Sequence, residues 1–190
     1  MKGIVFTLLE ETIVDEHGMD AWDRILEEAG LDGVYTTLGN YPYEQLVTLL
    51  QAAEPVVGYS GRRAQQWFGR RALHRLADRY PELFEPHTST REFALTLNDV
   101  IHPEVRKLYP GAEVPTFALD EDPEDGDLSL RYESERGLCS FAEGLLLGTG
   151  DRYGEEIGVQ QPRCVHEGDS YCDLVLTVEA STSREAHARG

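Results

Sequence analysis

The sequence predicts an α+β protein, in which a helical N-terminal lobe packs on a C-terminal lobe that contains a four-stranded, mainly antiparallel sheet and further helices. Three observations lead to this prediction. Apolar residues recur with a helical period of 3.6 up to about residue 109. After Pro110-Gly111 the period changes to two, and helical spacing returns only near residues 136–147. Such a run of helices followed by strands is typical of α+β proteins.

One domain is expected to hold these elements. At 190 residues the chain is long enough to bury a core of its own. We expect the domain to cover residues 1–178, with the helical lobe over about 1–60 and the second lobe over about 61–178. The small and polar residues 179–190 are predicted to form a flexible tail.

The helices are predicted from side-chain spacing and from their end signals. In residues 20–30 the apolar side chains follow the i, i+3, i+4, i+7 rule, and Gly30 suits a left-handed helix end. Residues 43–53 and 62–80 show the same spacing. The helix predicted over 89–101 opens with a serine that is followed three residues later by a glutamate, which is the spacing of a capping box.

The sheet is predicted from alternating apolar and polar residues. Four segments show this period of two: residues 114–119, 128–134, 155–160 and 171–178. The first two are joined by a turn at 120–127, which is rich in proline, glycine and acidic residues. Between the second and third strands, residues 136–147 are predicted to form a helix.

Composition and charge narrow the classes of partner. The chain has 35 acidic and 17 basic residues, which gives a formal net charge of −18. This charge repels phosphate backbones and anionic lipids, so neither nucleic acid nor a membrane is expected as a partner. The first residues, Met1–Phe6, lack the features of a signal peptide, and no apolar run is long enough to cross a bilayer. A cytoplasmic location is therefore expected.

His102 is the first residue that indicates specific chemistry. It precedes Pro103, which disfavours helical geometry at the residue before it, so the backbone is expected to bend or break there. On a helical wheel His102 lies opposite Phe93 and beside Val105 and Tyr109, and it is therefore expected to face a second cavity. A neutral imidazole in such a place is the usual proximal ligand of haem iron, although an isolated histidine at a kink is more often structural.

A second group of candidate residues follows the strand at 128–134. Strand alternation places Tyr132, Ser134 and, if the strand extends that far, Arg136 on one face, beyond the apolar Leu128 and Leu130. A phenol, a hydroxyl and a guanidinium beside an apolar surface are suited to binding carboxylates. Haem combines an apolar ring with two propionates on one edge, although an edge strand with a solvent-exposed arginine would show the same pattern.

Taken together, these motifs resemble the H-NOX (haem-nitric oxide/oxygen binding) family in its stand-alone bacterial form. The resemblance rests on Tyr132-x-Ser134-x-Arg136, on His102 about thirty residues earlier, on Pro115 between them and on the start Met1-Lys2-Gly3. It covers about residues 1–178. It implies that haem b lies between the two lobes, that His102 ligates the iron, and that Tyr132, Ser134 and Arg136 bind the propionates while Pro115 distorts the ring.

The resemblance also implies a function. The chain would be a gas sensor rather than an enzyme. Nitric oxide would bind the iron opposite His102 and break the iron–histidine bond, the pressure of Pro115 on the ring would relax, and the two lobes would shift. Because the sequence ends without an output domain, the change would be read by a separate protein. The resemblance suggests a histidine kinase or a cyclic-di-GMP enzyme.

The residues expected to face the gas are all apolar, and by the resemblance they are Val5, Leu9, Ala72, Leu76, Phe141 and Leu145. Bound dioxygen carries partial negative charge and is stabilised by a hydrogen-bond donor. Without such a donor, the protein is expected to bind nitric oxide and carbon monoxide and to discriminate against dioxygen. Tyr80 or His74 would supply a donor if either side chain turned inward.

The three cysteines form a third candidate site. Cys139, Cys164 and Cys172, with His166, offer the ligands of a tetrahedral zinc site. Some H-NOX proteins resemble this arrangement, but their histidine precedes the second cysteine by three residues, where this chain has Gln161. The fourth ligand would then be His166 or Gln161, or it would be missing. Structural zinc, a redox-active thiol cluster and plain reduced core cysteines all remain open.

Two other functions compete with the gas sensor. In the first, a haem-free switch, the three cysteines would sense oxidant or hold zinc, and the cavity would bind another amphipathic molecule. In the second, an enzyme would act on a tetrapyrrole or a similar small molecule, but the sequence offers no identifiable acid/base set for it. A haem spectrum that depends on His102 would favour the sensor, and a protein that stays colourless after haem addition would favour the switch.

Overall fold

The computed structural model describes residues 1–121 and 127–179. Its helices are α1 (Gly3–His17), α2 (Met19–Ala29), α3 (Tyr43–Val57), α4 (Arg62–Arg79), α5 (Thr90–Leu95), α6 (His102–Leu108) and α7 (Cys139–Tyr153). Shorter helical turns cover Pro81–Leu83, Leu97–Ile101 and Val165–Glu167. The strands are β1 (Thr116–Glu121), β2 (Leu128–Glu133), β3 (Glu156–Arg163) and β4 (Cys172–Glu179). Most of the predicted turn at 120–127 and nearly all of the predicted tail at 179–190 lie outside the described residues.

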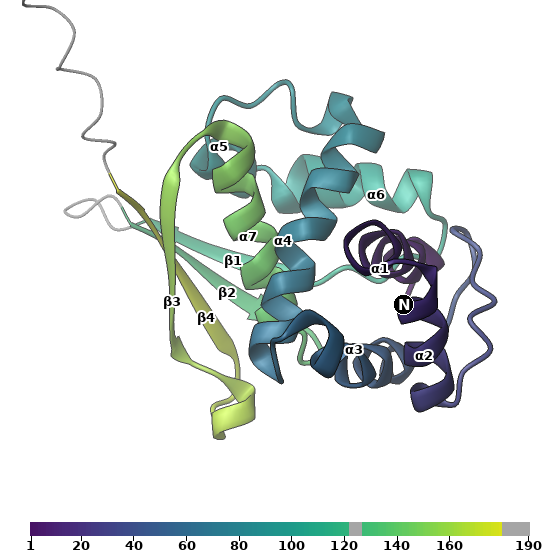
Figure 1. Cartoon of the computed structure of the whole chain (residues 1–190). Helices are drawn as coiled ribbons and strands as arrows, with labels where there is room; N and C mark the ends of the chain where they lie inside the picture. Colours follow the sequence, from purple (N-terminus) through teal and green to yellow (C-terminus); the bar gives the residue numbers. More distant parts are fainter. Residues whose placement is uncertain (122–126, 180–190) are drawn as a thin grey trace, which may run out of the picture.

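The four strands form one antiparallel sheet in the order β1-β2-β4-β3. The buried positions of β2 alternate as its sequence predicts, with Leu128, Leu130 and Tyr132 facing inward. Figure 1 shows α4 and α7 beside the sheet, with α1, α2 and α3 farther from it. The predicted α+β class, with a helical N-terminal lobe packed on a C-terminal lobe that contains a four-stranded sheet and further helices, is confirmed.

Two predicted boundaries near the sheet are wrong. The strand predicted over 128–134 ends at Glu133, so Arg136 does not belong to it. The helix predicted to begin at residue 136 begins at Cys139 and continues to Tyr153. Both errors have one cause, since the chain makes a turn in which the Gly137 amide donates to the Ser134 carbonyl and Gly137 adopts a φ of 59°. That left-handed conformation favours glycine and interrupts regular structure.

The predicted break at His102 takes a different form. Pro103 lies in the first turn of α6, where its missing N–H group has no helical partner to lose. The irregularity comes earlier, because Leu97–Ile101 form a π-helical turn and the His102 amide donates to the Leu97 carbonyl. Such wide turns are rare and are often found at functional sites.

Helices α4 and α7 are in unusually close contact. A Cβ atom added at Gly69 would lie 2.3 Å from the Phe141 carbonyl oxygen, and one added at Gly144 would lie 2.1 Å from that of Gln66. Real Cβ atoms do not approach other atoms so closely, so only glycine allows this helix crossing. Helix α4 is thereby fixed to the lobe that contains the sheet.

The first three residues are held by the rest of the fold. The Lys2 ammonium is buried and donates to the carbonyl oxygens of Leu38 (2.9 Å) and Pro110 (3.1 Å). A Cβ atom on Gly3 would lie 1.8 Å from the carbonyl oxygen of Thr36. The Met1-Lys2-Gly3 start therefore joins α1 to the segment before α3 and to the end of α6.

The core has two parts. One contains the inward side chains of α1, α2 and α3, and the other contains those of α5, α7 and the sheet. Helix α4 contributes to both, with Phe68 in the first and Leu73 in the second. Among the described residues, no helix is both long enough and apolar enough to span a bilayer.

An apolar cavity beside His102

A cavity of about 260 Å³ lies where the two parts of the core meet. Its walls come from α1, α4, α6 and α7, and from strand residues such as Phe117 and Tyr132. Of the residues predicted to form a site, the cavity is lined by His102, Pro115, Tyr132, Ser134, Arg136, Val5, Leu76, Phe141 and Leu145. The fold therefore brings together the histidine, the proline and the carboxylate-binding group, which are far apart in the sequence.

His102 lies on the cavity wall with 9% of its surface exposed. Burial, and to a smaller extent the nearby Arg106, lowers the pKa of its imidazole from 6.5 to about 4. The ring stacks on Phe117, with 5.9 Å between centroids and 28° between planes. At neutral pH the side chain is thus an uncharged imidazole in apolar surroundings, which is the form that ligates a metal ion.

The expected separation of Phe93 and His102 on opposite helix faces is wrong. Both side chains line the same cavity, together with Leu97 and Ile101. The prediction assumed one continuous α-helix over this segment, whereas the π-helical turn at Leu97–Ile101 inserts extra backbone between the two residues. That turn changes the direction in which His102 points.

The groups predicted to bind carboxylates lie at one edge of the cavity. Tyr132 is buried on β2, and burial raises the pKa of its phenol while hydrogen bonds with Ser134 and the Leu138 backbone lower it by less. The Ser134 hydroxyl accepts from the Arg136 amide at 3.3 Å. These three residues are joined by the turn after β2 rather than by a longer strand, and they still share the cavity edge.

Arg136 already has a carboxylate partner in this structure. Its guanidinium donates to the backbone oxygen of Glu113 at 2.6 Å and to the side-chain carboxylate of the same residue. The arginine side chain is 14% exposed and the glutamate side chain 82% exposed. The sequence analysis missed Glu113, because its segment has no regular periodicity that would indicate which way the side chain points.

The six residues predicted to face the gas divide into two groups. Val5, Leu76, Phe141 and Leu145 line the cavity. Leu9 and Ala72 do not, since both are fully buried in the core formed with α1, α2 and α3. Helix periodicity assigns both to an inward face, but it does not distinguish a cavity wall from the close-packed core next to it.

Two tyrosines supply further polar groups to the cavity. Tyr80 directly follows α4 and Tyr109 directly follows α6. Both line the cavity, and their hydroxyl groups are hydrogen-bonded to each other. Burial raises the pKa of Tyr109. Tyr80 is therefore inward, as the sequence allowed, but its hydroxyl is engaged. His74 instead contacts Asp151 at the surface, with 3.3 Å between Nε2 and Oδ2.

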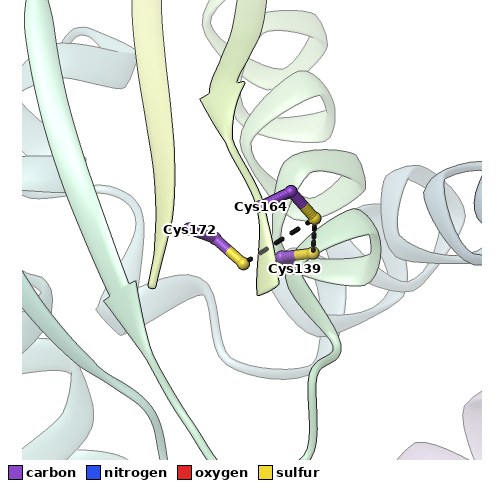
Figure 2. A group of neighbouring side chains, drawn as sticks. All are labelled: Cys139, Cys164 and Cys172. Atoms are coloured by element: carbon purple, nitrogen blue, oxygen red, sulfur yellow. Dashed lines mark hydrogen bonds between the residues drawn. The ribbon is translucent and has the colours of Figure 1, made fainter. Parts of the chain in front are cut away.

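The three cysteines form a separate, close-packed group. Cys139, Cys164 and Cys172 are fully buried, and their sulfur atoms lie within 4.8 Å of one another. Figure 2 shows the three side chains converging from α7 and from the ends of β3 and β4. The sulfurs of Cys139 and Cys164 are 3.8 Å apart, and those of Cys164 and Cys172 are 4.0 Å apart. Burial raises the pKa of the Cys172 thiol to about 12.

The residues considered as a fourth zinc ligand make other contacts. His166 is exposed and does not belong to the cysteine group, and its Nε2 lies 2.6 Å from the Gly137 carbonyl oxygen. The Gln161 side-chain oxygen accepts from Arg62, and its amide nitrogen is buried without a hydrogen-bond partner. The structure therefore brings three of the four predicted ligands together, and His166 does not join them.

The cavity fits a flat, amphipathic ligand. Its lining is mainly apolar, it has a neutral imidazole on one wall, and a phenol, a hydroxyl and a guanidinium lie at one edge. Haem needs these three things, namely apolar contact for the ring, an axial ligand for the iron and donors for the propionates. The side chains present are compatible with that group.

Comparisons with known proteins agree with this arrangement. The sequence profile HNOB, described as haem-NO-binding, matches residues 2–161, and the chain belongs to this family. An H-NOX protein from Shewanella oneidensis in the Fe(II)NO state is 30% identical, with a TM-score of 0.87 over 95% of this chain and 100% of that one. The Fe(II) unliganded H-NOX protein from K. algicida is 26% identical, with a TM-score of 0.83 over 97% and 100%.

A third solved structure is similar along nearly the whole chain. It is the IWP-051-bound H-NOX protein from Shewanella woodyi in the Fe(II)CO state, which is 31% identical, with a TM-score of 0.77 over 99% of each chain. The likeness covers the helical part and the sheet alike, and thus both walls of the cavity.

Proposed function

We propose that this protein is a haem-based gas sensor, not an enzyme, and that His102 is the proximal ligand of the iron of haem b. The observation that carries the proposal is the neutral, buried imidazole of His102 in an apolar cavity whose edge holds Tyr132, Ser134 and Arg136. The family and the Fe(II), Fe(II)NO and Fe(II)CO states of similar structures support it. When bound, haem supplies the iron at which a gas molecule binds.

The test is a haem spectrum that depends on His102. Purified ferrous protein should show a haem spectrum, which His102→Gly should alter and added imidazole should restore, because the free base takes the place of the deleted ring. Val100→Gly is a matched control, since Val100 is exposed and lies two residues earlier. A protein that stays colourless after haem addition would refute the sensor and favour the haem-free switch.

We propose that the sensor binds nitric oxide and carbon monoxide and discriminates against dioxygen. The wall formed by Val5, Leu76, Phe141 and Leu145 offers no hydrogen-bond donor, and one of the two hydroxyl hydrogens of Tyr80 and Tyr109 is used in the bond between them. Bound dioxygen would therefore lack the donor that stabilises its partial charge. Anaerobic reduction followed by exposure to air tests this, and a stable oxy spectrum would contradict it.

The proposed signal is a movement of the segment that contains His102. Release of His102 from the iron on nitric oxide binding would free α6, and relaxation of the contact made by Pro115 would let the helical lobe shift against the sheet lobe. A ligand that binds one of two such arrangements more tightly shifts the population toward it. We propose that a separate cytoplasmic protein, a histidine kinase or a cyclic-di-GMP enzyme, reads this shift. Its activity in the presence of this protein should change when nitric oxide is added.

We propose a second role for the cysteine group, namely structural zinc binding. Zinc–sulfur distances of about 2.3 Å in a tetrahedron require sulfurs about 3.8 Å apart, close to the separations of Cys164 from Cys139 and from Cys172. Complete burial argues against an oxidant-sensing thiol. Metal analysis should find about one zinc per chain, and Cys172→Ser should remove most of it. His166→Ala tests whether the exposed imidazole turns inward as the fourth ligand.

A further inference from the structure

The side chain of Asn98 is bonded to the edge of the sheet. Its Nδ2 donates to the Phe117 carbonyl oxygen at 2.5 Å, and its Oδ1 accepts from the Phe117 amide at 3.2 Å. Strand β1 is an edge strand, and the two backbone groups of an antiparallel residue point to the same side. The carboxamide thus takes the place that a neighbouring strand would occupy beside Phe117.

This contact joins two segments that line the proposed haem site. Asn98 lies in the π-helical turn Leu97–Ile101, whose last residue directly precedes His102. Phe117 lies two residues after Pro115, and its ring contacts both the ring of His102 (5.9 Å between centroids) and that of Tyr132 (5.8 Å). The hydrogen bonds of Asn98 therefore set the position of the π-helical turn relative to the strand against which the His102 imidazole stacks.

Among the residues that the structure describes, no backbone hydrogen bond provides this link. Helix α6 belongs to no sheet, and β1 is paired on its other side with β2, where Phe117 lies opposite Tyr132. Phe117 is 6% exposed, so loss of the carboxamide would leave a buried amide and a buried carbonyl without their partner. The asparagine is thus a bidentate connector, and among the described residues no other hydrogen bond joins these two segments beside the stacking of His102 on Phe117.

We propose that Asn98 is a positioning residue, which holds the His102 imidazole in register with Pro115 and Tyr132 and transmits displacement of α6 to β1. The proposal rests on the proposed function of His102 as the iron ligand. A movement of His102 away from the iron must either carry β1 along through Asn98 or break the two hydrogen bonds. In the first case the sheet receives the signal, and in the second the bonds oppose the release of His102.

The first measurement needs no haem. In Asn98→Leu, which has a similar volume but no polar atoms, hydrogen exchange at the Phe117 amide should be about tenfold or more faster than in the native chain, while amides in the α4–α7 contact should stay protected. In Asn98→Asp at neutral pH, the acceptor is kept but the donor is lost, so the amide should stay more protected than in Asn98→Leu. Val100→Ala, at an exposed position of the same turn, is the matched control and should leave the Phe117 amide unchanged.

The second measurement uses the haem-loaded ferrous protein. The iron–imidazole stretching band should shift in Asn98→Leu and stay in place in Val100→Ala, and the His102 imidazole should leave the iron about threefold to tenfold faster after addition of nitric oxide. Suppose that hydrogen exchange at the Phe117 amide is faster in Asn98→Leu, but the iron–imidazole band and the rate of His102 release are unchanged. This result would overturn the positioning role while leaving His102 as the iron ligand. An unchanged Phe117 amide would overturn the link itself. If the native chain bound no haem, the proposed function would fail, and the exchange measurement would still test the link.

Discussion

Helix α4 contacts α7 and α1 in different ways, and the difference indicates which part of the molecule can move. Toward α7 it presents Gly69, and α7 presents Gly144, so backbone meets backbone without room for a methyl group. Toward α1 it contributes Phe68 and Ala72 to the shared core, and at the surface Arg71, Arg75 and Arg79 bind acidic residues of α1. Close packing tolerates little displacement, whereas charged side chains at a surface can exchange partners at small cost. We therefore expect the helical lobe to shift along the α1–α4 contact.

The largest effect is expected from a methyl group placed in the α4–α7 contact. In Gly144→Ala the new Cβ would lie 2.1 Å from the Gln66 carbonyl oxygen, so the two helices must separate. We expect a loss of about 3 kcal/mol, beyond the gain in helix propensity, and a drop in melting temperature of about 10 °C. Thermal unfolding of the native chain and the variant measures the drop in melting temperature. Gly150→Ala is the control with the smaller clash, because its Cβ would lie 2.8 Å from Ile157 Cγ1 and 3.1 Å from the Glu155 carbonyl oxygen. Equal melting temperatures for the two variants would disprove the tight contact.

Low pH should destabilise the protein through His102, which lies on α6 at the cavity wall. The imidazole has a pKa of 6.5 in the unfolded chain and about 4 in the folded one, so below pH 6.5 the unfolded chain binds the proton more readily. The contribution of the neutral His102 imidazole to the free energy of unfolding is therefore fully present above pH 6.5. It is lost as the pH falls toward 4, by about 3 kcal/mol in the haem-free protein. Urea unfolding from pH 7 to 4 should show this loss relative to His102→Gln. If the free energy of unfolding changed with pH in the same way in the native chain and in His102→Gln, this prediction would be contradicted.

The arginine contacts on α1 should contribute less. Arg75 donates to Thr12 Oγ1 (3.1 Å), to the Glu11 carbonyl and to the Asp15 carboxylate (2.7 Å). Because the Asp15 side chain is 64% exposed, Arg75→Met should lower the free energy of unfolding by only about 1 kcal/mol. High salt should reduce the difference between native and variant, since it screens the ion pair but not the hydrogen bonds. The same substitution at the exposed Arg63 serves as control.

The sequence indicated most of the fold and the chemistry of the site, but not how its parts are joined. Residue type and period were enough for the β2 alternation and for the start of α5, where Ser89 accepts from the Glu92 amide, whereas His102 was grouped with Tyr132, Ser134 and Arg136 through the resemblance to H-NOX proteins. Periodicity failed where the backbone leaves its regular form, as in the π-helical turn before His102 and the turn at Gly137.

Contacts between segments that are distant in the sequence could not be predicted from sequence patterns either. The pairing of Tyr80 with Tyr109, of Asn98 with Phe117 and of Glu113 with Arg136 depends on how helices and loops are placed in space. No local pattern records that placement. Leu9 and Ala72 show the reverse case, since a correct inward orientation did not place them on the cavity.

The smallest expected effect concerns the charged contact at the cavity edge. Glu113 holds the guanidinium of Arg136, which is the group proposed to receive a haem propionate, so the two carboxylates compete for one arginine. Glu113→Gln removes the competing charge and should speed haem uptake by the haem-free protein by up to about fivefold, the range expected for an exposed ion pair. Stopped-flow absorbance after mixing with haem measures the rate.

Glu135→Gln is the matched control for this experiment, because it removes the same charge next to Arg136 in the sequence from an exposed side chain. A similar acceleration in both variants would mean that net charge alone governs uptake. Acceleration confined to Glu113→Gln would show that this ion pair must open before the cavity accepts its ligand. It would also extend to the cavity edge the expectation for α4, that its charged contacts with α1 give way more easily than its backbone contacts with α7.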